Sequence, residues 1–134
     1  MRLLGIDFGL THVGLAVGEK MPREYGTIDA KNLGELLSKI SIICREEKID
    51  KIIVGLPKSN LPKVKSKALI ATDNFIEALK AHINLPVETV DEAYSSVEAE
   101  MILSDEGVDW RKAKTKIHAL SAVLILNQYI SKNA

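Results

Sequence analysis

The sequence predicts an α/β domain on a mixed five-stranded sheet, three antiparallel strands followed by parallel ones, with helices on both faces. Two short apolar segments within the first 18 residues are joined by a glycine-containing turn, which is typical of a β-hairpin. Two later apolar segments are each preceded by apolar residues at helical spacing, which is typical of parallel strands joined by helices. The 134 residues, 46% of them hydrophobic, predict a single domain over residues 1–134 with a sizeable core.

The N-terminal part predicts an antiparallel meander. Leu3–Phe8 and Val13–Gly18 are the first two strands, and Gly9 supplies a conformation that branched residues adopt only at a cost. Tyr25–Asp29 is a shorter and weaker third strand.

Helices and parallel strands should follow. Apolar residues between Leu33 and Cys44 recur at helical spacing, and either Asn32 or Asp29 is suited to cap that helix. Lys51–Pro57 is apolar on both faces, which indicates a buried parallel strand. The remaining elements are a helix over Ala68–His82, a strand over Pro86–Asp91, a helix over Ser95–Leu103, and a last helix from Trp110 or Thr115 to Ile130.

The composition narrows the class of protein. Lysine plus arginine equals aspartate plus glutamate, 18 each, so nucleic-acid binding would have to come from local basic clusters. One cysteine, Cys44, excludes an internal disulfide framework and a multi-cysteine zinc site.

There is no signal-peptide pattern and no apolar run long enough to span a bilayer, so we expect a cytoplasmic protein. We also expect a monomer or weak homodimer.

Asp7 is the residue that says most about function. An ionised carboxylate inside an apolar strand is costly unless it is paired or binds a metal, and aspartate is depleted from strands. Two interpretations are open at this point: a carboxylate that accepts hydrogen bonds from the following turn, or a ligand of a divalent metal ion.

The order of the elements is that of the ribonuclease H-like fold, and four segments carry a closer resemblance. They are Gly5–Gly9 with Val13–Gly18, Ile52–Pro57, Val90–Glu92 followed by Ser95–Ala99, and Lys116–Ile117 with Ser121–Leu126. With these segments the chain resembles the YqgF family of Holliday-junction-resolvase-like proteins, also described as pre-16S rRNA nucleases. The resemblance covers essentially the whole chain.

The resemblance implies metal-dependent hydrolysis of phosphodiesters, with Mg²⁺ or Mn²⁺ held by carboxylates. The implied ligands are Asp7, Glu92 and the residue at position 118, which is His118 here instead of the family's aspartate. Adjacent strand residues point to opposite faces, so we expect Glu92 to be the ligand and Asp91 to be a turn residue or a supporting group at the catalytic site.

This chain departs from the family at three places. Besides His118, Ala93 replaces an arginine, and the loop Lys58–Pro62 lacks a glycine. Histidine suits Mn²⁺, Zn²⁺ or Fe²⁺ better than Mg²⁺ and is also able to act as a general base. The alternative for His118 is a buried or half-buried histidine on an otherwise apolar helix.

Two basic clusters are candidates for holding a phosphate backbone, the alternative being an ordinary solvated surface. They are Lys58, Lys63, Lys65 and Lys67 after one strand, and Arg111, Lys112, Lys114 and Lys116 near the start of the last helix.

The leading functional hypothesis is a nuclease for structured RNA or branched DNA, most specifically for pre-16S rRNA. The alternative is a catalytically degenerate protein that binds nucleic acid or assists ribosome assembly, which His118 and Ala93 favour. A phosphotransferase of the sugar-kinase type would need two such domains around a cleft, and this chain supplies one.

Overall fold

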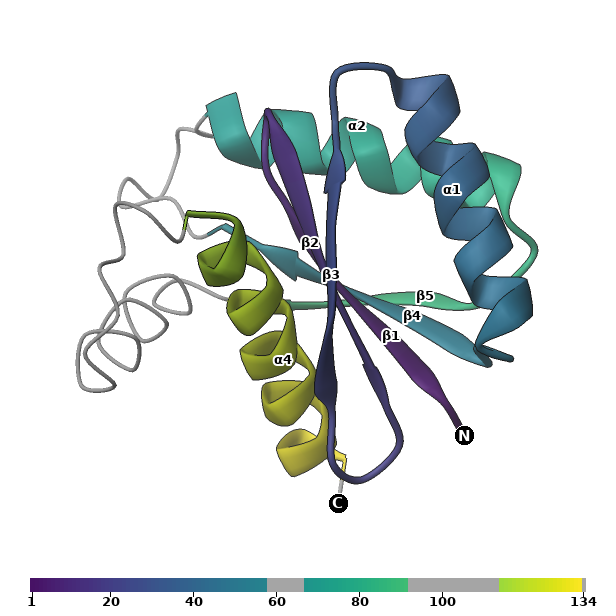
Figure 1. The fold of residues 1–134 in the computed structure, drawn as a ribbon, viewed down its shortest axis with the longest axis vertical. Helices are drawn as coiled ribbons and strands as arrows, with labels where there is room; N and C mark the ends of the chain where they lie inside the picture. The colour runs from purple at the N-terminus through teal and green to yellow at the C-terminus, as the bar shows by residue number, and fades with distance from the viewer. Residues whose placement is uncertain (58–66, 92–113, 134) are drawn as a thin grey trace.

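A computed structural model describes residues 1–57, 67–91 and 114–133 of the chain (Figure 1). Its sheet has the strand order β3-β2-β1-β4-β5. The strands are β1 (Leu3–Phe8), β2 (His12–Gly18), β3 (Arg23–Asp29), β4 (Lys51–Leu56) and β5 (Val87–Asp91). The helices are α1 (Leu33–Glu46), α2 (Lys67–His82) and α4 (Lys114–Lys132).

Strand β1 lies at the centre of the sheet, which agrees with its almost wholly apolar sequence and with the order of the elements. It pairs antiparallel with β2 on one side and parallel with β4 on the other. Strand β2 pairs antiparallel with β3, and β4 pairs parallel with β5. The mixed α/β sheet of five strands, three antiparallel and then parallel, is therefore confirmed.

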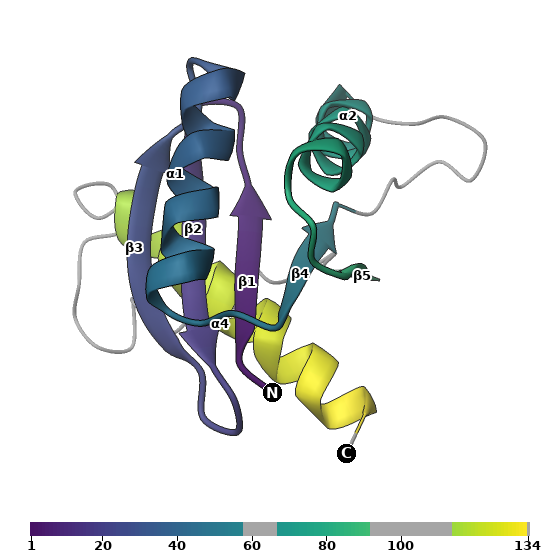
Figure 2. The ribbon, with the colours of Figure 1, turned by 90° about the vertical axis from the view of Figure 1, so that its right-hand side faces the viewer.

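The two faces of the sheet carry different helices (Figure 2). Helices α1 and α2 cover one face, where Leu4 and Ile6 of β1 join their buried residues in one core. Helix α4 covers the other face, where Leu3 packs with Ala122 and Leu126. Because strand residues alternate between faces, Gly5 and Asp7 share the α4 face with Leu3.

Helix α4 lies unusually close to the sheet because glycines and alanines line the contact. A Cβ atom on Gly14 would stand 2.0 Å from the His118 carbonyl oxygen, and one on Gly5 would stand 2.6 Å from Leu126 Cγ. Ala16, Ala119 and Ala122 are also buried there. The absence of larger side chains lets the backbone of α4 rest against β1 and β2.

Most sequence-based boundaries agree with the structure to within two residues. Strand β3 begins two residues earlier than predicted, at Arg23. Of the two predicted caps of α1, Asn32 is the one observed, and its Oδ1 accepts a hydrogen bond from Glu35 N at 3.0 Å. Cys44 is buried, and burial raises its thiol pKa to about 11. The helix predicted over Ser95–Leu103 lies outside the described residues.

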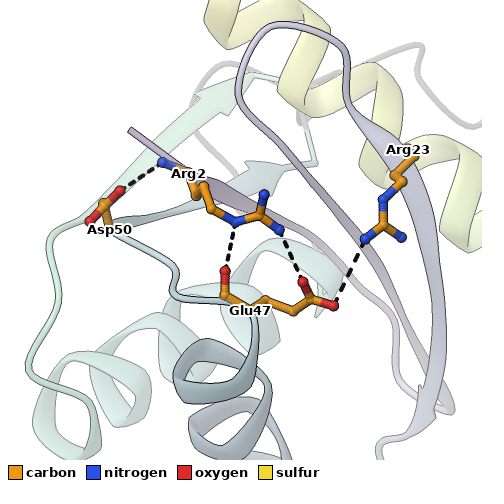
Figure 3. A network of polar contacts seen from close by, with 4 residues as sticks. All are labelled: Arg2, Arg23, Glu47 and Asp50. Carbon is orange, nitrogen blue, oxygen red and sulfur yellow. Dashed lines mark hydrogen bonds and ion pairs between the residues drawn. The ribbon is translucent and has the colours of Figure 1, made fainter.

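A polar network ties the start of β1 to the end of α1 and to β3 (Figure 3). The Arg2 guanidinium donates to the Glu47 carbonyl at 2.6 Å and to its carboxylate at 3.0 Å. Arg23 reaches the same carboxylate at 3.9 Å, and Asp50 accepts from Arg2 N at 2.7 Å.

A search of the helices in the described part of the chain finds no candidate membrane span.

Candidate active site around Asp7 and His118

Asp7 is a buried acidic side chain on the central strand. It is the penultimate residue of β1, and its exposed fraction is 5%. It points to the α4 face, so its carboxylate needs a partner from that helix, since an unpaired buried charge is strongly destabilising.

His118 supplies that partner from the first turns of α4. Its Nδ1 lies 3.0 Å from Asp7 Oδ2, although the two residues are 111 positions apart in the chain. The imidazole is partly exposed, at 31%, whereas the carboxylate is almost completely enclosed. The His118 carbonyl lies against Gly14, and this contact sets the distance between α4 and the sheet and thereby the position of the His118 side chain.

The geometry of the pair allows two chemical uses. A carboxylate oxygen only accepts, so in the direct hydrogen bond Nδ1 carries the hydrogen and Nε2 is left to bind a proton or a metal ion. Alternatively, both atoms would hold one divalent cation, because neighbouring ligands about 2.1 Å from an octahedral ion stand about 3.0 Å apart. The observed Nδ1–Oδ2 distance of 3.0 Å therefore fits a divalent cation as well as a hydrogen bond.

His12 stands beside this pair and was not among the residues selected from the sequence. Its ring stacks on that of His118, with centroids 6.4 Å apart and planes 25° from parallel. Its Nδ1 contacts Thr11 Oγ1 at 3.2 Å. Alternate residues of a strand share a face, so His12 is expected on the same face as Gly14, the face that α4 covers. Only the packing of α4 shows that His12 meets His118 there.

By the alternation of side chains along the strands, Asp91 falls on the opposite face of the sheet from Asp7. Val90 packs under α4, so its neighbour Asp91 belongs to the opposite set of β5 residues, and it is exposed. As the last residue of the edge strand, Asp91 nevertheless reaches a hollow beside the second half of α4, which Asn127, Gln128 and Ser131 also line. Glu92, the ligand expected from the sequence, lies outside the described residues, so the expected difference between Asp91 and Glu92 stays a prediction.

The predicted basic clusters fall mostly outside the described part of the chain. Lys58, Lys63, Lys65, Arg111 and Lys112 are not described. Lys114 and Lys116 belong to the first turn of α4, and Lys67 is the exposed first residue of α2.

Within residues 1–57, 67–91 and 117–133, no three histidine, cysteine, aspartate or glutamate side chains gather to hold a metal ion. Asp7 and His118 form a pair, and a third protein ligand such as Glu92 would have to come from elsewhere in the chain. The donor set, one carboxylate and one imidazole, suits Mn²⁺ and similar divalent ions.

Residues 1–132 match the family model of RuvX, described as Holliday junction resolvase. The chain belongs to the RuvX family. This confirms the YqgF resemblance drawn from four short segments, because RuvX and YqgF denote the same family.

Curated relatives of this RuvX-family protein match it over nearly their whole length. A protein of Mycoplasmopsis synoviae named "Putative pre-16S rRNA nuclease" is 33% identical, covering 97% of both chains. One of the same name from Syntrophomonas wolfei is 32% identical, covering 97% of this chain and 94% of the relative.

Solved structures support the fold. RuvC of T. thermophilus, in complex with a Holliday junction substrate, superposes with a TM-score of 0.60 at 16% identity, covering 93% of this chain and 90% of RuvC. Fowlpox virus resolvase, solved with Holliday junction DNA, also has a TM-score of 0.60, at 10% identity and 98% coverage of both chains. At these identities the two structures establish a shared resolvase-type architecture.

Proposed function

We propose that this RuvX-family protein is a divalent-metal-dependent nuclease that processes pre-16S rRNA, with Asp7 and His118 among its metal ligands. The observation that carries the proposal is the 3.0 Å contact between a buried strand carboxylate and a histidine of α4. Family membership makes a nuclease the expected activity, and the contact supports placing its chemistry at Asp7 and His118.

The preference for RNA rests on the relatives. Proteins that are 31–33% identical over nearly the whole chain carry the pre-16S rRNA nuclease name. The junction-DNA resolvases are only 10–16% identical, which supports a common fold but not a common substrate. A nuclease for precursor rRNA works where ribosomes are assembled, so we propose that this protein acts in the cytoplasm. The expectation of a monomer or weak homodimer stays a prediction from the sequence.

The residues present fit a divalent cation, which would supply Lewis-acid stabilisation of the charge that develops at the phosphate. Asp7 would supply a hard oxygen and His118 a nitrogen to the same ion, and we retain Glu92 as the third ligand from the sequence. The exposed part of His118 is then the side from which substrate approaches, because Asp7 itself is enclosed. Lysines and arginines of the two basic clusters, Lys67 included, would hold the phosphates on either side.

A cleavage assay tests this proposal. Purified protein is given a labelled pre-16S rRNA fragment or a four-way DNA junction, with Mg²⁺, Mn²⁺ or Ca²⁺. We expect cleavage of the RNA, fastest with Mn²⁺. Asp7→Asn should lower the cleavage rate by more than about 100-fold. Mutating a residue that only holds a metal ligand in place lowers activity by about 10- to 100-fold, and loss of the ligand itself should lower it at least as much. Binding in EDTA should be unchanged or tighter, because one negative charge near the phosphates is removed.

Glu24→Gln is the matched control, because it neutralises an exposed carboxylate on the edge strand β3. It should cleave like the unaltered protein. Failure to cleave with all three metals, or an Asp7→Asn variant as active as the control, would refute the proposal. Junction cleavage without RNA cleavage would overturn the substrate assignment alone.

A further inference from the structure

The β1–β2 turn, residues 9–12, is built tightly against the candidate site. A Cβ on Gly9 would stand 2.5 Å from the His12 carbonyl oxygen and 3.2 Å from His118 Cε1, so the turn closes directly over the histidine. The Thr11 carbonyl accepts from Ala30 N at 3.0 Å, which ties the turn to the end of β3. These contacts hold the turn in one place beside Asp7 and His118.

The turn presents apolar and aromatic groups outward. Leu10 is 69% exposed, unlike its apolar neighbours Phe8 and Val13, which pack in the core. His12 is also exposed, while its ring stacks on His118. An apolar side chain and a ring thus project from a fixed turn next to the place where a phosphodiester would be cut.

The charge of the turn itself indicates which part of a nucleic acid it would meet, although Lys31 follows Ala30 beside Thr11. No lysine or arginine occurs between Leu3 and Gly18, so this stretch offers no fixed positive charge to a phosphate. Exposed apolar side chains and rings instead contact bases, as wedges at an opened step or as stacking surfaces. The turn is therefore suited to an uncovered nucleobase.

We propose that Leu10 and His12 form a base-contacting edge that engages an unpaired or unstacked nucleotide at the cleavage point. The inference rests on the proposed function, because it takes the substrate to be a nucleic acid with its phosphate at Asp7 and His118. The edge selects structured substrates with an accessible base over continuous duplex.

Binding without metal tests the edge separately from cleavage. The full chain in EDTA is titrated into RNA hairpins that carry one unpaired 2-aminopurine, and into the fully paired duplex. Leu10→Ser and His12→Ala should each weaken binding to the hairpin by about tenfold, the loss of one apolar or stacking contact. Both should reduce the 2-aminopurine fluorescence change and leave duplex binding unaltered. An abasic site at the unpaired position should abolish the difference between Leu10→Ser and the unaltered protein.

Two variants control for general effects of the substitutions. Met21→Ser removes an 87% exposed apolar side chain from the β2–β3 turn at the opposite end of the strands, and His82→Ala removes an exposed histidine from the end of α2. Both should bind like the unaltered protein. If Leu10→Ser and His12→Ala match these controls on the hairpin, the base-contacting edge is refuted while the nuclease proposal stands. If the unaltered protein binds neither RNA in EDTA, the base-contacting edge is refuted, and the cleavage assay with added metal decides the nuclease proposal separately.

Discussion

His118 is the residue on which the chemistry of the site depends. It pairs with a carboxylate that is 5% exposed, and pairing offsets the cost of burying that charge. As the metal ligand that we propose, it would also make the ligand set softer than an all-carboxylate one, which would favour Mn²⁺ over Mg²⁺. In this proposal the same residue serves both stability and the choice of metal, and an experiment can separate the two roles.

Replacing His118 with aspartate separates them. Without metal, His118→Asp places a second carboxylate beside Asp7 and should lower the free energy of unfolding by about 2–4 kcal/mol. Mg²⁺ should restore stability, because it binds the native state only, and Mg²⁺-dependent cleavage should rise. Thermal melts and cleavage assays with and without Mg²⁺ measure both effects.

The control for this substitution is His82→Asp, at an exposed position on α2, which should alter neither measurement. A stable His118→Asp variant that gains no Mg²⁺-dependent activity would favour the alternative of a degenerate nucleic-acid-binding protein over a nuclease.

At the scale of elements, the close contact between α4 and β2 positions the site. Gly14 touches the backbone of α4 at His118 itself, so the distance between helix and sheet sets the distance between His118 and Asp7. Structure is rigid at such a backbone contact, because neither partner has a side-chain rotamer that can move away.

Gly14→Ala should therefore move α4 outward. Its Cβ would lie 2.0 Å from the His118 carbonyl oxygen, and we expect a loss of about 2–3 kcal/mol in unfolding free energy. Cleavage should fall as well, since a displacement of about 1 Å at a catalytic group can cost about 100-fold. Urea unfolding and the cleavage assay measure these effects.

Gly34→Ala, in the first turn of α1, is the comparison. A Cβ there meets only Asn32 Oδ1 at 3.3 Å, and alanine favours helix, so stability should be unchanged or higher by up to about 1 kcal/mol. A Gly14→Ala variant with the stability and activity of the unaltered protein would show that α4 is not held by this contact.

At the scale of the whole molecule, a polar cluster joins the C-terminal half of α4 to the parallel strands β4 and β5. Lys51 Nζ of β4 lies 3.0 Å from Tyr129 Oη and 2.9 Å from Glu88 of β5, and Tyr129 also donates to Glu88. Hydrogen bonds from Tyr129 and then Lys51 lower the Glu88 pKa, while those with Tyr129 and then Glu88 raise the Lys51 pKa. The cluster joins three elements distant in sequence.

These pKa directions predict a window of pH in which the cluster stabilises the fold. The Glu88 contribution is complete above its ordinary pKa of 4.5 and disappears as pH falls through the lowered value. The Lys51 contribution is complete below 10.5 and disappears as pH rises through the raised value. Tyr129→Phe should reduce the melting temperature most inside this window and progressively less on either side.

Melting curves from pH 3 to pH 11 check the prediction, with Tyr25→Phe on β3 as the control, since that tyrosine is exposed. A Tyr129→Phe effect of the same size at every pH would mean that the hydroxyl contributes packing alone.

The sequence by itself determined the described elements, their order and the family. Hydrophobic periodicity, the Asn32 cap and the glycine turn act over a few residues, so they can be recognised without knowing the fold. The same local patterns placed β1 at the centre of the sheet, because a strand apolar on both faces must be covered on both.

Only the tertiary structure decided what meets Asp7. Its partner lies 111 residues away, and their contact depends on how deeply α4 settles on Gly5 and Gly14, a distance that no local pattern encodes. The exposed position of Leu10 and the stacking of His12 on His118 are decided in the same way. Burial and long-range contacts are properties of packed surfaces, whereas periodicity belongs to the chain alone.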